Sequence, residues 1–385
     1  MGLKTVTILG ATGSVGTQTL DLVAANPELY AVSALVGGRN VRLLAEQARQ
    51  FRPEITVISD PLLLDELRAA LADTNLACAA GRAAVIEAAG RKVDWTMSAI
   101  TGVAGLEPTL AAVAHGGTIA FANKEALVSA GDVFLRAVTA SGATLLPVDS
   151  EHNAVMQAMA DGNPVEKIIL TASGGPFRNH EIEEMRGITP EAALRHPVWS
   201  MGAKISIDSA TMMNKGLEVI EAARLFSLDS AQIEVLVHPQ SVIHGMVCYA
   251  DGSVLAQLGA PDMRIPIAHS LAWPKRIATK SPRLSLAEVS RLEFSAPDPV
   301  RFPALRLARA ALEAGAGAPT VLNAANEVAV SAFLARQIGF LDIAGIVESV
   351  LAQLGAPAVP DLAAVLALDL AARGAASQLA TARAA

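Results

Sequence analysis

The sequence predicts an α/β protein that begins with a doubly wound parallel sheet. Short apolar runs alternate with helical patterns through the first 150 residues, a rhythm typical of parallel strands joined by crossover helices. The first apolar run leads into the glycine-rich segment Gly10–Gly16 and then into a helical pattern. Strands are expected at 5–9, 31–36, 54–59, 94–99, 118–122 and 143–148.

Different patterns follow and divide the rest of the chain. Between residues 150 and 272, strand patterns at 168–171 and 234–237 and a hairpin signal at Asp251-Gly252 predict a central α+β domain with a mixed or antiparallel sheet. Five prolines and scattered charges over 273–303 indicate a linker. Glycine and proline breaks then separate four helical patterns. The predicted parts are a nucleotide-binding domain, a catalytic domain, a linker and a C-terminal helical bundle, at 1–149, 150–272, 273–303 and 304–385.

Composition excludes several classes of protein. The 385 residues carry 30 basic and 37 acidic side chains, a net charge of −7, which argues against a nucleic-acid partner. A hydrophobic share of 52% with 17% charged residues excludes a disordered chain. We find neither an uninterrupted apolar stretch of roughly 18 residues nor a leader pattern, so we expect no membrane span. Cys78 and Cys248 cannot form a disulfide framework, and we expect a cytoplasmic location.

Three glycines mark the turn after the first predicted strand. Gly10, Gly13 and Gly16 are spaced for a tight turn, a close backbone approach and close helix packing, as in Rossmann-like folds. Free N–H groups at the start of the next helix would receive a pyrophosphate. The alternative is an ordinary glycine turn in a flavodoxin-like fold.

The end of the second strand distinguishes between two nicotinamide cofactors. Sites for NAD usually place an acidic residue there to bind the ribose hydroxyls. This sequence instead continues Gly37-Gly38-Arg39-Asn40, with no acid and with an arginine placed for a 2′-phosphate. The sequence therefore favours NADPH, although a solvated surface arginine would give the same pattern.

Two dehydrogenase classes need a residue that this sequence does not offer. Short-chain dehydrogenases require a lysine four residues after a tyrosine, and neither Tyr30 nor Tyr249 has one. Semialdehyde dehydrogenases require a nucleophilic cysteine. Cys248 falls within a predicted strand and Cys78 in an alanine-rich stretch, so neither position suggests an activated thiol.

Polar clusters follow two strands of the predicted sheet. Asn123-Lys124-Glu125 follows one strand, and Asp149-Ser150-Glu151-His152-Asn153 follows the next. Open α/β sheets bind ligands at such carboxyl ends. Asp149 and Glu151 are two residues apart, and two carboxylates on one side of an extended segment suit Mg²⁺ or Mn²⁺. A helix N-cap at Asp149 or Ser150 is an equally consistent interpretation.

A helical pattern that begins near residue 212 adds a third carboxylate. Asn214, Glu218 and Glu221 lie within about 60° of one another on one helix face, and Lys215 borders that face. The flanking residues are apolar, which argues against a fully exposed helix. Glu218 would complete the metal site, while Asn214 and Lys215 would bind an anionic group.

One further segment could bind an anion, and another has the composition of a lid. Thr171–Phe177 combines a strand with a glycine turn that offers N–H groups and a hydroxyl, and a plain turn is about as consistent. His196–Gly202 places aromatic, methionine and histidine side chains in a loop typical of lids. The alternative is a loop that packs locally around Trp199.

Other polar residues are expected to support the site rather than form it. The spacing of His238 and His244 is not a usual metal spacing, so both are expected to be structural or to lie behind the site, with His244 nearer to it. Asn323, Asn326 and Glu327 are expected to form a polar helix face or a domain contact.

These motifs together resemble one family. The chain is similar to the 1-deoxy-D-xylulose 5-phosphate reductoisomerases, NADPH-dependent enzymes of the non-mevalonate route to isoprenoids. The resemblance covers nearly the whole chain, in order, with small departures at Ala172 and Gly245 outside the ligand positions. The matching segments are Gly10–Gly16, Ala122–Glu125, Pro147–Asn153, Ser173–Phe177, His196–Pro197, Trp199–Gly202, Lys204–Glu218, His238–His244 and Leu322–Glu327.

The resemblance implies a role for each matched position. The implied metal ligands are Asp149, Glu151 and Glu218, which with Lys124 are the implied catalytic residues. The implied phosphate pocket consists of Ser173, Ser209, Asn214 and Lys215. The substrate's carbon chain would lie among Lys124, Ser150, Glu151 and His196, under a lid of Trp199 and Met201. The implied NADPH contacts are Thr12, Gly13, Ser14, Val15, Gly38, Arg39, Asn40, Asn123, Glu125 and Gly202.

The implied reaction converts 1-deoxy-D-xylulose 5-phosphate to 2-C-methyl-D-erythritol 4-phosphate. A divalent cation (Mn²⁺, Mg²⁺ or Co²⁺) would chelate the ketone and a neighbouring hydroxyl. The carbon skeleton would rearrange to an aldehyde, which hydride from NADPH would reduce. Lys124 would assist proton movement or stabilise an enediolate. The family further implies a homodimer that acts on a small phosphorylated sugar.

Two other hypotheses agree with part of the sequence. An NADP-dependent oxidoreductase without rearrangement, such as a semialdehyde dehydrogenase, would need an activated cysteine. A non-catalytic NADP-binding sensor or scaffold would be favoured if a carboxylate or Lys215 had been lost, and all of these residues are present.

Overall fold

The computed structural model describes residues 3–160, 162–199 and 201–384, which form two compact units. Unit 1 consists of Met1–Ala126, Phe134–Asn153 and Asp262–Ser281, and unit 2 consists of Leu127–Val133, Ala154–Pro261 and Pro282–Ala385. The partition differs from the predicted boundaries at 149 and 272, because residues 262–281 belong with the N-terminal sheet.

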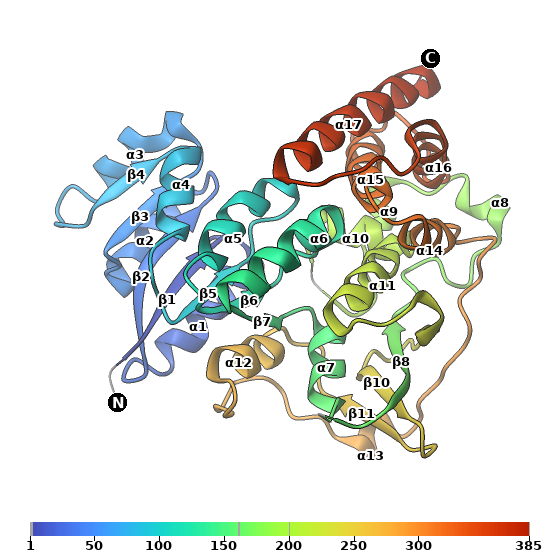
Figure 1. The fold of residues 1–385 in the computed structure, drawn as a ribbon, viewed down its shortest axis with the longest axis horizontal. Helices are drawn as coiled ribbons and strands as arrows, with labels where there is room; N and C mark the ends of the chain where they lie inside the picture. Colours follow the sequence, from blue (N-terminus) through green and yellow to red (C-terminus); the bar gives the residue numbers. More distant parts are fainter. Residues whose placement is uncertain (1–2, 161, 200, 385) are drawn as a thin grey trace. The chain divides into compact units, whose positions relative to one another are not determined.

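Unit 1 contains the predicted Rossmann-like parallel sheet (Figure 1). Among the described residues it has seven strands in the order β4-β3-β2-β1-β5-β6-β7. The strands are β1 (Lys4–Leu9), β2 (Tyr30–Gly37), β3 (Ile55–Ile58), β4 (Cys78–Ala80), β5 (Trp95–Ser98), β6 (Thr118–Phe121) and β7 (Thr144–Pro147). The order reverses between β1 and β5, so the crevice that binds ligands in such sheets opens at the end of β1. The six predicted strands are confirmed, and the three-residue β4 was missed.

Helices cover the sheet of unit 1 and join its strands. They are α1 (Ser14–Ala24), α2 (Val41–Phe51), α3 (Leu64–Ala70), α4 (Arg82–Ala89), α5 (Leu106–Val113), α6 (Lys124–Ser141) and α12 (Arg264–Ala272), with 3-10 turns η1 (Pro61–Leu63) and η2 (Val103–Gly105). Ile267 and Leu271 of α12 pack into the same apolar cluster as Ile8 and Trp95. This burial explains why α12, which we predicted to lie in the catalytic domain, belongs to unit 1.

Unit 2 contains a mixed sheet, as predicted. Its strand order is β11-β10-β8-β9 among the residues described, with β8 and β9 parallel and the other pairs antiparallel. The strands are β8 (Val165–Ala172), β9 (Ile233–Val237), β10 (Ile243–Tyr249) and β11 (Val254–Leu258). The predicted hairpin joins β10 to β11 through Gly252, whose φ of 86° suits glycine.

The helices of unit 2 share one apolar core with this sheet. They are α8 (Ile182–Met185), α9 (Pro190–Ala193), α10 (Ala203–Ala210), α11 (Met213–Phe226), α13 (Leu286–Val289), α14 (Ala304–Ala314), α15 (Ala318–Leu334), α16 (Asp342–Leu354) and α17 (Leu362–Ala384), with the 3-10 turn η3 (Ser230–Gln232). The helix α7 (Ser150–Ala158) begins in unit 1 and ends in unit 2. The four helices predicted beyond residue 304 are confirmed as α14 to α17.

The C-terminal helix α17 is rich in alanine. Within the described part of the chain it is long and apolar enough, by length and composition alone, to cross a membrane. Its Arg373 pairs with Asp369 on the same helix and with Glu327 on α15, and Ala372 and Ala376 are buried. These contacts show how a helix of this composition is held in a protein bundle, and the expected lack of a membrane span stays a prediction.

Candidate active site

The turn after β1 is packed as closely as its glycine spacing predicted. Gly10 has a φ of 93°, and a Cβ there would lie 2.6 Å from the carbonyl oxygen of Ala99. A Cβ on Gly16 would lie 2.2 Å from the carbonyl oxygen of Gly10. Because no side chain fits at either position, α1 approaches the turn closely, and Gln47 secures the turn through a 2.9 Å hydrogen bond to the carbonyl of Ala11.

The N-terminus of α1 begins with exposed residues. The helix begins at Ser14 with Gly13 as its N-cap, and no acidic residue lies in its first turn. Gly13 and Ser14 are exposed, while Thr12 and Val15 are half-buried. Unpaired N–H groups at such an exposed helix start attract anions. The four predicted cofactor residues therefore line the start of α1.

The segment after β2 combines an exposed arginine with a helix cap. The Arg39 side chain is 80% exposed, and its Nε lies 3.3 Å from a carboxylate oxygen of Asp60. Asn40 caps α2, since its Oδ1 accepts a hydrogen bond from the N–H of Leu43. An exposed ion pair contributes little free energy, so Arg39 can exchange Asp60 for a phosphate. The cap was not part of our sequence interpretation of Asn40.

Asn123 has a structural role in addition to the predicted cofactor contact. It is buried, its Oδ1 accepts a hydrogen bond from the N–H of Ala126, and its Nδ2 donates to the carbonyl of Gly102 at 3.1 Å. These bonds cap α6 and fix the loop after β5. Glu125, the next predicted cofactor residue, is also buried.

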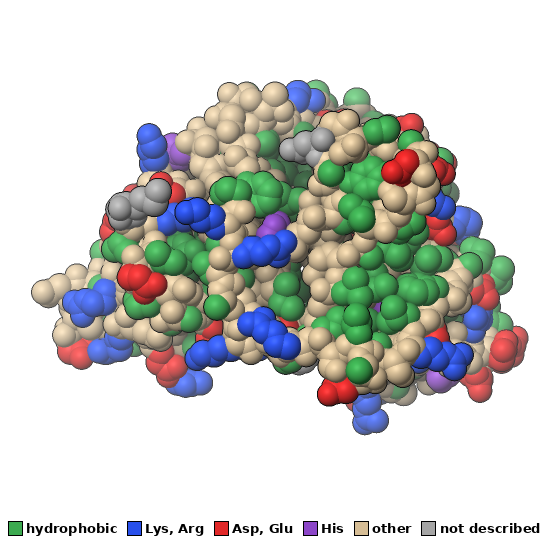
Figure 2. All heavy atoms as spheres, turned by 90° about the horizontal axis from the view of Figure 1, so that it is seen from below, with side chains coloured by type: hydrophobic (Ala, Val, Ile, Leu, Met, Phe, Trp, Pro, Cys, Tyr) green, Lys and Arg blue, Asp and Glu red, His purple; other side chains and the backbone are tan. Residues whose placement is uncertain are grey.

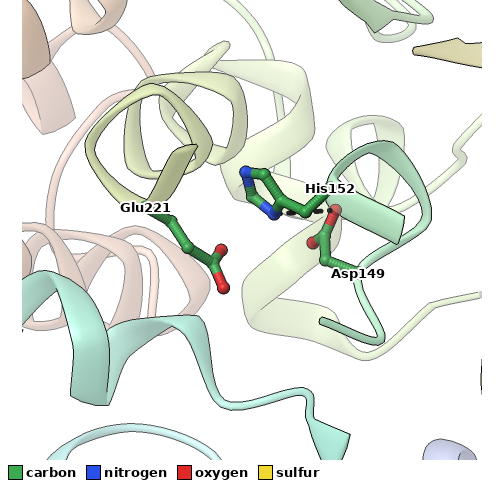
Figure 3. A group of neighbouring side chains, drawn as sticks. All are labelled: Asp149, His152 and Glu221. Carbon is green, nitrogen blue, oxygen red and sulfur yellow. Dashed lines mark ion pairs between the residues drawn. The ribbon is translucent and has the colours of Figure 1, made fainter. Parts of the chain in front are cut away.

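The segment after β7 places the carboxylate of Asp149 next to the buried ammonium group of Lys124. Lys124 Nζ is paired with Asp149 Oδ2, and both side chains are nearly buried. The other oxygen, Oδ1, lies 3.7 Å from His152 Nδ1, and Figure 3 marks this pair with a dashed line. The same oxygen is 3.4 Å from the N–H of Glu151. Asp149 thus faces a helix start and a lysine at once, so the N-cap interpretation and the ligand interpretation are compatible.

Neighbouring side chains complete this segment of unit 1. Ser150 Oγ donates to Glu151 Oε2 at 2.6 Å. Asn153 Nδ2 donates to the carbonyl of Pro147 at 2.8 Å and lies 3.1 Å from Nδ1 of His269. Burial, aided by the charge of Arg276, lowers the pKa of His269 to about 4. Sequence reasoning missed His269, because nothing in the pattern of 264–272 shows which side chain meets α7.

In unit 2, α11 holds the third predicted carboxylate. Glu218 is fully buried, and its two oxygens accept hydrogen bonds from Asn214 Nδ2 and Lys215 Nζ. The helical spacing placed Asn214 and Glu218 on one face, and this contact confirms it. Glu218 is therefore bonded to the two residues that we predicted to bind an anion, and Lys215 forms an ion pair with it.

Ser173 and the start of the lid are joined through His196. Nδ1 of His196 accepts hydrogen bonds from the N–H groups of Trp199 (2.8 Å) and Val198 (3.2 Å), so the proton is on Nε2. Nε2 lies 2.9 Å from Ser173 Oγ, which also accepts from the N–H of Gly175. Burial lowers the pKa of His196 and preserves this neutral form. The Ser173 hydroxyl proton is therefore left to donate to a ligand.

Close backbone packing brings Ser209 to the same region of unit 2. A Cβ on Gly175, whose φ is 67°, would lie 2.9 Å from the carbonyl oxygen of Ser209. Met212, in the left-handed conformation, then joins α10 to α11, which carries Lys215. Ser209 therefore lies beside the glycine turn after β8 that follows Ser173.

The predicted lid is described except for Ser200. The Trp199 ring lies 6.1 Å from the ring of His244, and Met201 is half-buried. Gly202 is exposed and is the N-cap of α10. His244 thus lies against the lid, in agreement with its predicted place nearer the site.

His238 has the structural role that we expected. Its Nδ1 donates to the carbonyl of Glu293 at 2.9 Å, its Nε2 accepts from the N–H groups of Val242 and Ile243, and its ring stacks on Phe294. The imidazole is therefore neutral and fully occupied, and it ties the linker to the end of β9.

The asparagines of α15 make internal contacts in unit 2. Asn326 Nδ2 donates to Asp208 Oδ1 of α10 at 2.8 Å, and Lys204 Nζ is 2.9 Å from the other oxygen. Asn323 Nδ2 lies 3.3 Å from Ser129 Oγ and 3.2 Å from Glu327. Both asparagines are therefore buried inside unit 2 rather than displayed on an exposed polar helix face.

A parallel sheet with a close-packed glycine turn at its switch point is the fold of a nicotinamide-dependent oxidoreductase, and the segment after β7 carries two carboxylates, the kind of oxygen donor that divalent cations prefer. The chain belongs to the 1-deoxy-D-xylulose 5-phosphate reductoisomerase family. Residues 6–131 match the profile of that name, 145–226 match the profile of its C-terminal domain, and 258–375 match a further profile called DXP reductoisomerase C-terminal domain.

Relatives of the same name match most of their own length. The 1-deoxy-D-xylulose 5-phosphate reductoisomerase of Gluconobacter oxydans is 63% identical over 90% of this chain and 86% of its own. That of Rhodospirillum centenum is 59% identical over 98% and 94%. The solved structure from Zymomonas mobilis in complex with NADPH has 53% identity and a TM-score of 0.94, covering 98% of this chain and 99% of its own. A reductoisomerase in complex with NADPH, fosmidomycin and magnesium has 43% identity and a TM-score of 0.93, covering 98% of both chains.

Proposed function

We propose that this chain converts 1-deoxy-D-xylulose 5-phosphate to 2-C-methyl-D-erythritol 4-phosphate in the non-mevalonate route to isoprenoids, using NADPH and a divalent cation. The observation that carries the proposal is the arm after β7 (residues 147–153), which carries Asp149 and Glu151 two residues apart and pairs Asp149 with the buried Lys124. Neither a simple dehydrogenase nor an NADP-binding scaffold needs such an arm. Relatives of 63% and 59% identity carry the name of this enzyme.

The proposed cation ligands are Asp149 and Glu151 from unit 1 and Glu218 from unit 2. All three offer oxygen only, the donor that Mg²⁺ and Mn²⁺ prefer, and two of them lie two residues apart on the arm after β7. When bound, the cation supplies Lewis-acid polarisation of the ketone and hydroxyl oxygens of the substrate. Lys124 Nζ holds a proton beside Asp149 and is placed to stabilise an enediolate or return a proton.

The substrate phosphate is proposed to bind in unit 2. Ser173 has a hydroxyl proton free to donate, and Lys215 and Asn214, whose side chains bond to Glu218 in this structure, would bind the phosphate. Because His196 bonds to Ser173 and to two N–H groups of the lid, phosphate binding is coupled to the loop that carries Trp199 and Met201.

NADPH is proposed to bind along the carboxyl edge of the parallel sheet and to supply the hydride. The N–H groups at the start of α1 receive its pyrophosphate, and Arg39 receives its 2′-phosphate. Gly38 leaves the approach open, since no atom lies within 4 Å of a Cβ placed there. Glu125 and Gly202 are assigned to the cofactor by the family resemblance.

We further propose a homodimer in the cytoplasm. The four-stranded sheet carries a small apolar cluster that includes Met246 and Cys248, and its outer strand β11 exposes Val254 and Leu255. The right-hand part of Figure 2 shows hydrophobic side chains gathered on one face. An exposed apolar edge strand invites pairing with another chain, and a second copy is the occupant that we propose. Sedimentation equilibrium tests the dimer.

The decisive experiment follows the absorbance of NADPH with 1-deoxy-D-xylulose 5-phosphate. Oxidation that needs both the substrate and Mn²⁺, and stops on addition of chelator, is the expected result. Oxidation without added metal in chelator would contradict the proposed role of the carboxylates. A folded protein that binds NADPH and oxidises none with any divalent cation would reject the proposed substrate.

A further inference from the structure

We propose that His269 is a positioning residue for the metal-binding arm, which it holds in place through Asn153. The arm is the segment 147–153, which carries Asp149 and Glu151. The inference rests on the proposed function, since it concerns how two of the proposed ligands are held. His269 lies on α12, more than a hundred residues further along the chain.

The first step is the orientation of the Asn153 amide. Its terminal atom lies 2.8 Å from the carbonyl oxygen of Pro147, and a carbonyl can only accept. That atom is therefore the amide nitrogen. The same nitrogen lies 3.1 Å from Nδ1 of His269, so Nδ1 accepts the second N–H and carries no proton. One NH₂ group thus bonds to the end of β7 and to α12 at the same time.

The second step concerns the shape of the arm. It leaves the sheet at Pro147, and Asn153 returns to the same carbonyl from the first turns of α7. The N–H of Asn153 also donates to the carbonyl of Asp149 at 2.9 Å. The arm is therefore a closed loop, and its closing residue is anchored to α12 by His269.

The third step is the rigidity of the imidazole itself. His269 is 7% exposed, and the ring of Trp273 meets it edge-on at 5.4 Å. The adjacent Ala268 and Leu271 belong to the apolar cluster beneath the parallel sheet. Because burial keeps the imidazole neutral, Nδ1 remains an acceptor at the pH of the cell. The ring is thus a fixed point against which the arm is aligned.

A cation site is sensitive to such alignment. Side chains that orient metal ligands from behind typically change metal affinity about 10-fold to 100-fold when they are removed. His269 acts through one intermediate residue, so we expect the lower end of that range. The cofactor turn after β1 does not depend on this hydrogen bond, and NADPH affinity should therefore be unaffected.

The test compares three variants by titration with Mn²⁺, followed by electron paramagnetic resonance in the presence of NADPH. His269→Phe keeps an aromatic ring against Trp273 and removes the acceptor. His269→Asn places an oxygen acceptor close to the position of Nδ1. Ser270→Ala is the matched control, since it also removes a buried polar atom from α12 but does not reach Asn153.

We expect His269→Phe to bind Mn²⁺ about tenfold more weakly. Its NADPH affinity, measured by fluorescence, should stay within twofold of the native value, and its kcat should recover at saturating Mn²⁺. His269→Asn and Ser270→Ala should bind Mn²⁺ like the native protein. Native Mn²⁺ affinity in His269→Phe would overturn the inference, as would an equal loss in His269→Asn and His269→Phe.

Two further variants keep the test decisive. If His269→Phe does not fold, Asn153→Ala removes the bond to His269 together with the bond to Pro147 while leaving the buried ring in place, and a loss of at least tenfold is expected. Asp149→Asn distinguishes the inference from the proposed function. Native Mn²⁺ affinity in Asp149→Asn would reject the proposed ligands themselves. A loss in Asp149→Asn without one in His269→Phe or Asn153→Ala would reject the positioning role alone.

Discussion

The buried imidazole of His269 should make the stability of the protein depend on pH. The perturbation is a change from pH 7.5 to pH 5.0, applied to the native protein and to His269→Asn, which cannot titrate at this position. The pKa of His269 is about 4 in the folded protein, whereas a histidine in the unfolded chain keeps the ordinary value of 6.5. The unfolded state therefore binds the proton more tightly, so stability is complete above about pH 6.5 and falls as the pH drops toward 4.

The size of the effect follows from the two pKa values. At pH 5.0 the linkage relation gives a loss of about 2 kcal/mol relative to pH 7.5. Part of the pKa shift comes from Arg276, whose charge is screened by solvent, so we expect a loss of about 1–2 kcal/mol. The sign is fixed by burial: the folded protein must protonate an imidazole that it has enclosed with apolar neighbours.

Urea unfolding followed by tryptophan fluorescence measures this loss at both pH values. The native protein should lose about 1–2 kcal/mol more than His269→Asn, because the contributions of all other groups, His196 included, are common to both proteins. Equal losses in the two proteins would refute the reasoning, and a smaller loss in the native protein would reverse its sign. Either result would mean that His269 is hydrated in solution.

Three other predictions concern the site. Glu218→Gln should abolish turnover while NADPH still binds, as steady-state kinetics and fluorescence titration would show, and an active variant would remove Glu218 from the metal site. Arg39→Ala should weaken the preference for NADPH over NADH about tenfold, since it removes one charge-assisted contact, and an unchanged ratio of kcat/KM values would reject that contact. Gly16→Ala should lose NADPH binding, because its Cβ would meet the carbonyl of Gly10 at 2.2 Å; native affinity would contradict this packing.

Local patterns were enough to predict much of the fold. The short apolar runs and the glycine turn are local features, and six strands of the parallel sheet lie where they indicated. The turn at Asp251-Gly252 likewise predicted the β10–β11 hairpin. The strand β4 was missed, because three residues at the edge of a sheet carry too little pattern to be distinguished from a loop.

Helix geometry also predicted part of the site. Asn214 and Glu218 are one turn apart, so their contact needs no tertiary information. The spacing of Asp149 and Glu151 was interpreted as two carboxylates on one side of an extended segment, and this was wrong, because Glu151 lies in the first turn of α7, which begins at Ser150. The pairing of Lys124 with Asp149 was harder to predict from the sequence, since it joins residues 25 positions apart through the adjacency of β6 and β7.

The sequence by itself determined the elements, the cofactor turn and the identity of the candidate ligands, because each depends on residues close together in the chain. Tertiary structure alone decided what holds those ligands. That α12 packs under the parallel sheet, and that His269 therefore reaches Asn153, depends on apolar contacts between segments more than a hundred residues apart. Such contacts are selected by burial and shape across the whole core, and no local spacing records them.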